Sequence, residues 1–125
     1  MDAEPTADHV ADDEWLTRLF ERDDWQEGKI SSAAFKSELV SVFRDRYLRV
    51  NSVIEEHSKD CGAAQITAGF VRADPRHDLE VIKDEPPYAH AHIQTSSGKR
   101  NTTGQARRLR DQAMMKIAKL PQGLE

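Results

Sequence analysis

Polar and apolar positions alternate in three stretches of the chain, and such alternation is typical of β-strands. Residues 64–71 alternate well, with Gly69 marking a bulge or a close backbone approach. Residues 79–83 alternate again after a turn at residues 74–78, and residues 89–93 do so after a double proline. We expect these three segments to form an antiparallel meander.

Apolar residues at helical spacing predict two helices in the first half of the chain. Asp12 can cap a helix over residues 12–25, where acidic residues in the first turn suit the positive end of the helix dipole. Residues 44–60 repeat apolar side chains at the same spacing, and Gly62 is a natural residue to end that helix. A short helical piece is expected at residues 33–35.

The most regular helical pattern covers residues 102–120. Thr102 and Gln105 have the spacing of a capping box, and Pro121 helps to stop the helix. The apolar stripe of this predicted helix consists of Ala106, Leu109, Ala113, Ile117 and Leu120.

Residues 39–43 contain β-branched side chains that suit a short buried strand, although the same residues could continue a helix. We interpret them as a strand. The predicted fold is therefore α+β, with a small antiparallel sheet of three to four strands packed against two to three helices. Residues 1–11 are expected to be a flexible acidic tail, residues 12–121 a single domain, and residues 122–125 a C-terminal tail.

Composition indicates a polar protein without a membrane span. Hydrophobic residues make up 38% and charged residues 32% of the 125 positions. No apolar run approaches the roughly 20 residues that a spanning helix needs. The single cysteine, Cys61, excludes an internal disulfide and fits a reducing compartment, so we expect a cytoplasmic protein.

The net charge of −4 conceals two oppositely charged halves. Residues 1–62 hold 15 acids and 8 bases, net −7, whereas residues 63–125 hold 7 acids and 10 bases, net +3. Most of the positive charge lies between Lys99 and Lys119, where seven bases accompany only Asp111. Such a division allows an acidic arm to screen a basic surface, or two different partners to be engaged.

The segment at residues 89–93 also carries the most concentrated candidate chemistry. Side chains alternate across a strand, so His90 and His92 are expected on one face and Ala91 on the other. The two imidazoles could be metal ligands, a pH-sensitive contact surface, or simply the solvated face of a half-buried strand. No further ligand has suitable spacing, so neither a metal site nor a cofactor is predicted.

The sequence from His90 to Gln94 resembles the His-x-His-x-Gln signature of the histidine-triad nucleotide hydrolases and transferases. The resemblance covers five residues and implies that His92 would attack an α-phosphate. A second candidate nucleophile is Cys61, which lies one helical turn from His57, but a small buried residue at a helix end is the stronger explanation of this cysteine.

The basic residues near the predicted C-terminal helix suggest a contact with phosphates. Lys99 and Arg100 precede the helix, and Arg107 and Arg108 lie within it. No aromatic stacking platform accompanies them, and the spacing around Gly98 is not that of a Walker-type phosphate loop. An ordinary charged helix surface is the alternative interpretation.

Several short features together resemble a group of uncharacterised small bacterial proteins. They are Gly28, Ala34-Phe35, Ser41-Val42, residues 64–69, and the proline-containing segment that ends at His90-Ala91. The resemblance implies a bacterial cytosolic origin and a role beside other gene products. It supplies no activity.

We therefore expect a small accessory or interaction protein without catalysis of its own. Its partner would be a protein or a nucleic acid, contacted through the basic C-terminal helix and the His-bearing strand. The alternative is a nucleotide or phosphoester hydrolase that uses His90 and His92.

Overall fold

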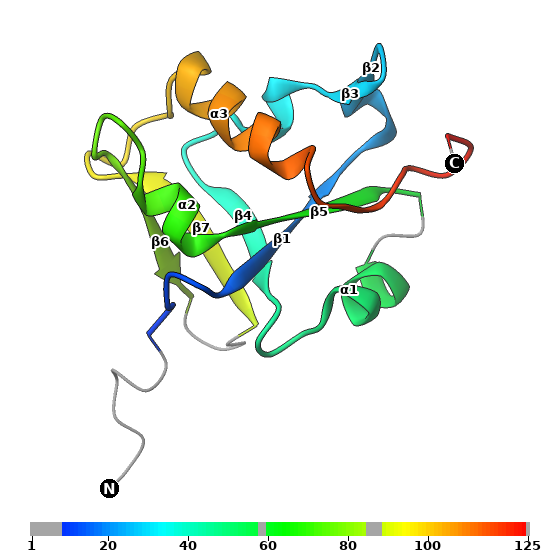
Figure 1. Ribbon diagram of the computed structural model, residues 1–125, viewed down its shortest axis with the longest axis horizontal. Helices are drawn as coiled ribbons and strands as arrows, with labels where there is room; N and C mark the ends of the chain where they lie inside the picture. Colours follow the sequence, from blue (N-terminus) through cyan, green and yellow to red (C-terminus); the bar gives the residue numbers. More distant parts are fainter. Residues whose placement is uncertain (1–8, 58–59, 85–88, 125) are drawn as a thin grey trace, which may run out of the picture.

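The computed structural model describes residues 9–57, 60–84 and 89–124, with only the backbone of His57 included. The strands are β1 (Trp15–Phe20), β2 (Trp25–Gln26), β3 (Lys29–Ile30), β4 (Val40–Arg44), β5 (Gly62–Thr67), β6 (Leu79–Lys83), β7 (His90–Thr95) and β8 (Ile117–Lys119). The helices are α1 (Val50–His57), α2 (Ala68–Arg72) and α3 (Thr103–Ala113), with 3-10 helices η2 (Arg22–Asp24) and η3 (Ser32–Phe35). Figure 1 shows their arrangement.

An antiparallel sheet with helices on both of its faces confirms the expected α+β class. The main sheet has six strands in the order β6-β7-β4-β1-β5-β8, rather than the three to four that were predicted. β2 and β3 form a separate hairpin whose turn places Glu27 and Gly28 at positive φ. A left-handed backbone at such a turn favours glycine.

The predicted helix at residues 12–25 is wrong, because Trp15–Phe20 forms strand β1. β1 pairs with β5 along its whole length and with β4 at Leu16 and Thr17. A strand in the interior of the sheet can bury both of its faces, and Leu16 and Thr17 are both fully buried. The resulting run of buried residues lacks simple alternation, which is why it resembled a helical stripe.

The C-terminal helix begins as predicted but ends early. Thr102 and Gln105 form the reciprocal capping box, and α3 stops at Ala113 instead of residue 120. Ile117 belongs to β8, which pairs with β5. Pairing supplies partners for the outer edge of β5, and these hydrogen bonds outweigh the helical spacing of the sequence.

The predicted meander is correct only for the hairpin of β6 and β7. β5 ends at Thr67, whose hydroxyl accepts a hydrogen bond from the Phe70 N–H and caps α2. Gly69 therefore lies in a helix rather than at a bulge. Its N–H donates to the Asp12 carbonyl at 2.8 Å, so this glycine does allow a close backbone approach.

Of two elements predicted for the middle of the chain, one is confirmed and the other is shorter than expected. The strand expected at residues 39–43 is confirmed as β4. The helix expected at residues 44–60 is shorter, because α1 covers only Val50–His57. The Asp45 carboxylate accepts a hydrogen bond from the Val50 N–H at 2.9 Å, which fixes the start of this helix.

The main hydrophobic core lies between one sheet face and the layer formed by α2, α3 and η3 (Figure 1). β4 and β7 alternate between buried and accessible residues, and β6 does so from Leu79 to Ile82, so their inner apolar side chains enter this core. Fully buried members include Leu16, Phe35, Val40, Ile66, Ile93 and Leu109. Val10, from the segment expected to be a tail, is buried with them.

The opposite sheet face is covered over β1 and β5. α1 lies on that side in Figure 1, and its Val53 is fully buried outside the main core, as is Ala63 of β5. Beneath the helix, the Gln65 amide donates to the Thr17 hydroxyl at 3.1 Å. The covered half of this face therefore holds buried residues outside the main core, including a buried polar bond.

Gly62 and Gly104 provide a matched pair of glycine substitutions. A Cβ at Gly62 would overlap the Phe20 ring, whereas a Cβ at Gly104 would come no closer than 3.8 Å to the Thr102 hydroxyl. We expect Gly62→Ala to destabilise the fold by about 1–3 kcal/mol through overpacking. Gly104→Ala should stabilise α3 by up to about 1 kcal/mol. Urea denaturation measures both; equal effects would contradict the packing described.

Candidate functional site

His90 and His92 leave β7 on the same side of the sheet, away from the main core. Their neighbours Ala91 and Ile93 are buried on the other side. His92 lies directly across from Ser41 of β4 and from Ile82 of β6. The alternation that the sequence predicted for this segment is therefore the one that the strand adopts.

Both ring nitrogens of His92 contact side chains of the protein. Nδ1 lies 2.7 Å from the Asp84 carboxylate, and Nε2 lies 2.9 Å from the Gln94 amide oxygen. The side chain of His92 is 18% exposed. A carboxylate-held imidazole can act as a base only when its second nitrogen is available, so Gln94 would have to move first.

His90 makes an aromatic contact instead. Its ring meets the Phe43 ring edge-on, with centroids 4.7 Å apart and an interplanar angle of 84°. Phe43 is its direct partner across β4 and β7. This geometry is a favourable arrangement for two rings, and it fixes the position of the His90 imidazole beside an apolar surface.

These residues belong to a surface that we call the open face, defined by Ser41, Ile82, His90, His92 and Gln94. It is the side of β4, β6 and β7 opposite the main core. Ile82 is 37% exposed, and Leu39 beside the start of β4 is 53% exposed. The open face therefore presents apolar groups around a histidine that is held in place by hydrogen bonds.

The predicted basic residues divide into two kinds. Lys99, Arg100 and Arg107 are exposed. The Arg108 guanidinium donates to the Phe70 carbonyl at 2.8 Å and stacks over the Phe70 ring at 3.8 Å. Its Nη1 atom is buried without a hydrogen-bond partner. Arg108 therefore joins α3 to α2 rather than facing solvent.

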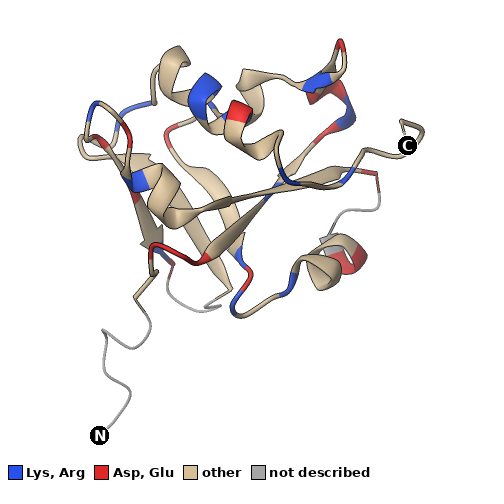
Figure 2. Cartoon of the chain, in the orientation of Figure 1, with Lys and Arg blue, Asp and Glu red and all other residues tan. Residues whose placement is uncertain are grey.

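The basic helix and the histidines also lie on opposite faces of the sheet. The buried side of α3 packs into the same core as Ala91 and Ile93, whereas His90 and His92 project the other way. Figure 2 shows acidic and basic positions mixed along α3 and the neighbouring loops. The two contact surfaces expected from the sequence are thus separate.

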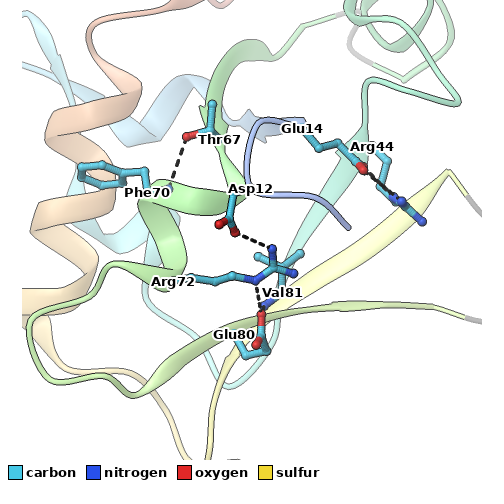
Figure 3. Close-up of polar contacts among 8 residues, drawn as sticks. All are labelled: Asp12, Glu14, Arg44, Thr67, Phe70, Arg72, Glu80 and Val81. Carbon is cyan, nitrogen blue, oxygen red and sulfur yellow. Dashed lines mark hydrogen bonds and ion pairs between the residues drawn. The ribbon is translucent and has the colours of Figure 1, made fainter. Parts of the chain in front are cut away.

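An ion-pair chain that the sequence did not indicate lies along the outer edge of β6 (Figure 3). Arg72 donates to Glu80 at 2.6 Å and to Asp12 at 2.8 Å, and Glu80 also accepts the Val81 N–H at 2.7 Å. Burial acts to raise the pKa of Glu80, but these hydrogen bonds outweigh it and hold the pKa below its ordinary 4.5. Asp12 and Arg72 are 60 positions apart, which is why spacing gave no signal.

Cys61 offers little support for a thiolate nucleophile. Burial, together with the neighbouring carboxylates of Glu21 and Asp60, raises the pKa of its thiol. A raised pKa keeps the thiol protonated and unreactive. The side chain of His57, the proposed partner, lies outside the described residues.

Neither a metal centre nor a spanning helix is found in the described part of the chain. Its His, Cys, Asp and Glu side chains form no group of three or more that could hold a metal ion. Among the same residues, no helix has both the length and the apolar character needed to cross a membrane.

Comparisons with known proteins leave the chain without an assigned relative. No family model, no curated protein and no solved structure matches it. The two resemblances noted in the sequence remain predictions.

Adjacent arginines on α3 allow a direct test of their different positions. Arg108→Ala removes the hydrogen bond to Phe70 and the stacked contact, and we expect a loss of about 2 kcal/mol in unfolding free energy. Arg107→Ala removes an exposed side chain and should change stability by less than about 0.5 kcal/mol. Denaturant titration compares them; similar losses in both variants would contradict the assignment.

The lowered pKa of Glu80 gives a pH dependence with a definite sign. A carboxyl whose pKa is lower in the folded state adds stability above its unfolded pKa, and this stability disappears as pH falls through the folded value. Glu80→Gln should therefore be less stable than wild type at pH 7, by about 0.5 kcal/mol for so exposed a pair. Below pH 4.5 the difference should shrink towards zero.

Thermal melts across this pH range make the measurement. Glu38→Gln is the matched control, because Glu38 is exposed and makes no ion pair among the described residues. A Glu80→Gln deficit that persists unchanged in acid would refute the ion-pair explanation.

Proposed function

We propose that this protein is a non-catalytic interaction module whose open face binds a protein partner. The observation that supports this proposal is the incomplete covering of the sheet. One face carries the main core, whereas the other is buried at Thr17, Ala63 and Gln65 and left accessible at Ser41 and Ile82. A surface that mixes accessible apolar groups with polar and aromatic ones is typical of a protein-binding site.

The polar residues of the open face are already ordered by contacts within the protein. His92 is held between Asp84 and Gln94, and His90 is packed against Phe43. Side chains fixed in advance lose less conformational freedom when a partner binds, which lowers the entropic cost of association. The histidines thus serve as positioned contact groups.

Hydrolysis by His90 and His92 is the weaker candidate. A histidine that attacks phosphorus needs an accessible ring nitrogen, and Gln94 occupies Nε2 of His92 while Asp84 occupies Nδ1. The Asp84–His92 pair would suit a general base only after Gln94 has turned away. The resemblance to the histidine-triad signature therefore receives no support from the arrangement of this strand.

Nucleic-acid binding is the third candidate function, and three of the four basic residues predicted for it are accessible to a ligand. Lys99, Arg100 and Arg107 are exposed, and no ion pair among the described residues neutralises them. Arg108 is committed to Phe70. Arg107 lies on α3, on the packed side of the sheet, whereas Arg100 lines a hollow together with Leu39 beside the open face. An experiment with separate probes on α3 and on the open face can distinguish the two contacts.

Site-specific photocrosslinking tests the proposal in cells that make the protein. A benzophenone amino acid at Ile82 or at Ser41 should capture a discrete protein partner on irradiation. The same group at the exposed Ala33, on the packed side of the sheet, should capture none and is the matched control.

The outcomes separate the candidate functions. Equal capture from Ile82 and Ala33 would contradict a specific contact at the open face. Capture of nucleic acid from Arg107, with no protein captured from Ile82 or Ser41, would replace the proposal with nucleic-acid binding.

A further inference from the structure

The edge strand β6 has backbone groups directed away from the sheet. The Ser96 N–H donates to the Asp78 carbonyl, and the Asp84 N–H donates to the His90 carbonyl. Hydrogen-bonded pairs alternate along an antiparallel ladder, so Glu80 and Ile82 bond to β7 as well. The N–H and carbonyl groups of Leu79 and Val81 consequently point outward.

The Val81 N–H already has an acceptor from its own chain. The Glu80 carboxylate lies 2.7 Å away and takes the position in which a neighbouring strand would place a carbonyl oxygen. Arg72 holds this carboxylate, and Asp12 holds Arg72 (Figure 3). Glu80 therefore takes the place of a neighbouring strand, since none of the described strands pairs with this edge of β6.

A hollow runs beside the same edge. Its volume is about 320 Å³, and it is lined by His9, Val10, Arg72 and residues 80–83. Val10 and Val81 are buried members of the main core. The hollow is thus continuous with apolar packing and has room for small apolar side chains of an added strand.

Charge around this edge defines the chemistry of the added strand. Asp12 and Glu80 share the single guanidinium of Arg72, and both carboxylates are substantially exposed, at 77% and 51%. When a partner carbonyl replaces Glu80 at the Val81 N–H, the Glu80 carboxylate becomes available for a cation of the partner. Two copies of this chain fit poorly, because an antiparallel pair centred on Val81 would oppose Asp78 and Asp84.

We propose that an extended segment of a partner protein, alternating small apolar and basic side chains, adds to β6 as a seventh strand. The inference rests on the proposed function, because Ile82 belongs both to β6 and to the open face. Main-chain hydrogen bonds supply the attachment, the hollow receives the apolar side chains, and Glu80 receives the basic ones.

The test uses the full chain and a short synthetic peptide of alternating lysine and valine. Hydrogen exchange at the amides of Leu79 and Val81 is followed by NMR, with Glu80 and Ile82 as internal controls already bonded to β7. In peptide at about ten times its Kd, exchange at Leu79 and Val81 should slow about tenfold. The control amides should slow no more than the rest of the sheet.

Two further peptides make the result specific. N-methylation of every peptide amide removes the donors of the added strand and should abolish the effect. Replacement of lysine by glutamate should weaken binding at least tenfold. No protection at Leu79 and Val81, or equal protection by the N-methylated peptide, would overturn strand addition. Crosslinking at Ile82 without this protection would leave the proposed function intact and remove only the inference about β6.

Discussion

A buried ion pair between Glu14 and Arg44 fixes the centre of this structure. The carboxylate accepts two hydrogen bonds from the guanidinium, at 2.6 and 3.0 Å, and the side chains are 5% and 0% exposed (Figure 3). Glu14 immediately precedes β1, and Arg44 is the last residue of β4. The pair therefore joins the start of one interior strand to the end of another. Removal of one member of such a pair leaves a buried charge and typically costs about 3–5 kcal/mol.

The rest of the arrangement follows from this junction. Asp45, directly after Arg44, accepts hydrogen bonds from the Val50 N–H and from the Gln65 amide, so α1 begins beside β5. The Glu14 carbonyl accepts the Ala68 N–H, which sets α2 on the other side. The main core therefore lies on one face, with α2 and α3, and α1 lies on the other. The open face is the part that no described helix reaches, and it carries the histidines.

Local signals in the sequence predicted the elements whose environment is local. The hairpin of β6 and β7 alternates because one of its faces is packed, and the start of α3 depends on Thr102 and Gln105 alone. The contact of Asp84 with His92 could have been anticipated, because the hairpin register brings residues 82–84 beside residues 90–92. The different positions of Arg107 and Arg108 could not have been anticipated, because both are adjacent cations in one charged helix.

Long-range contacts decided the elements that were missed. The acids before β1 resembled a helix start, yet Glu14 serves Arg44, 30 positions away. β8 is a strand because it pairs with the edge of β5, and no local pattern near Ile117 predicts that pairing. The same limitation applies to the site: the strand with the histidines was identified, but the openness of its face depends on where α1 ends.

The division of one sheet face into a covered and an open half is the central claim, and a soluble nitroxide tests it most directly. Methyl signals of Ile82 and Leu39 should broaden strongly as the nitroxide is added, while those of Val53 and Ala63 on the covered half stay sharp. Equal protection of all four residues would contradict the account, because the proposed contact surface would then be buried within the protein.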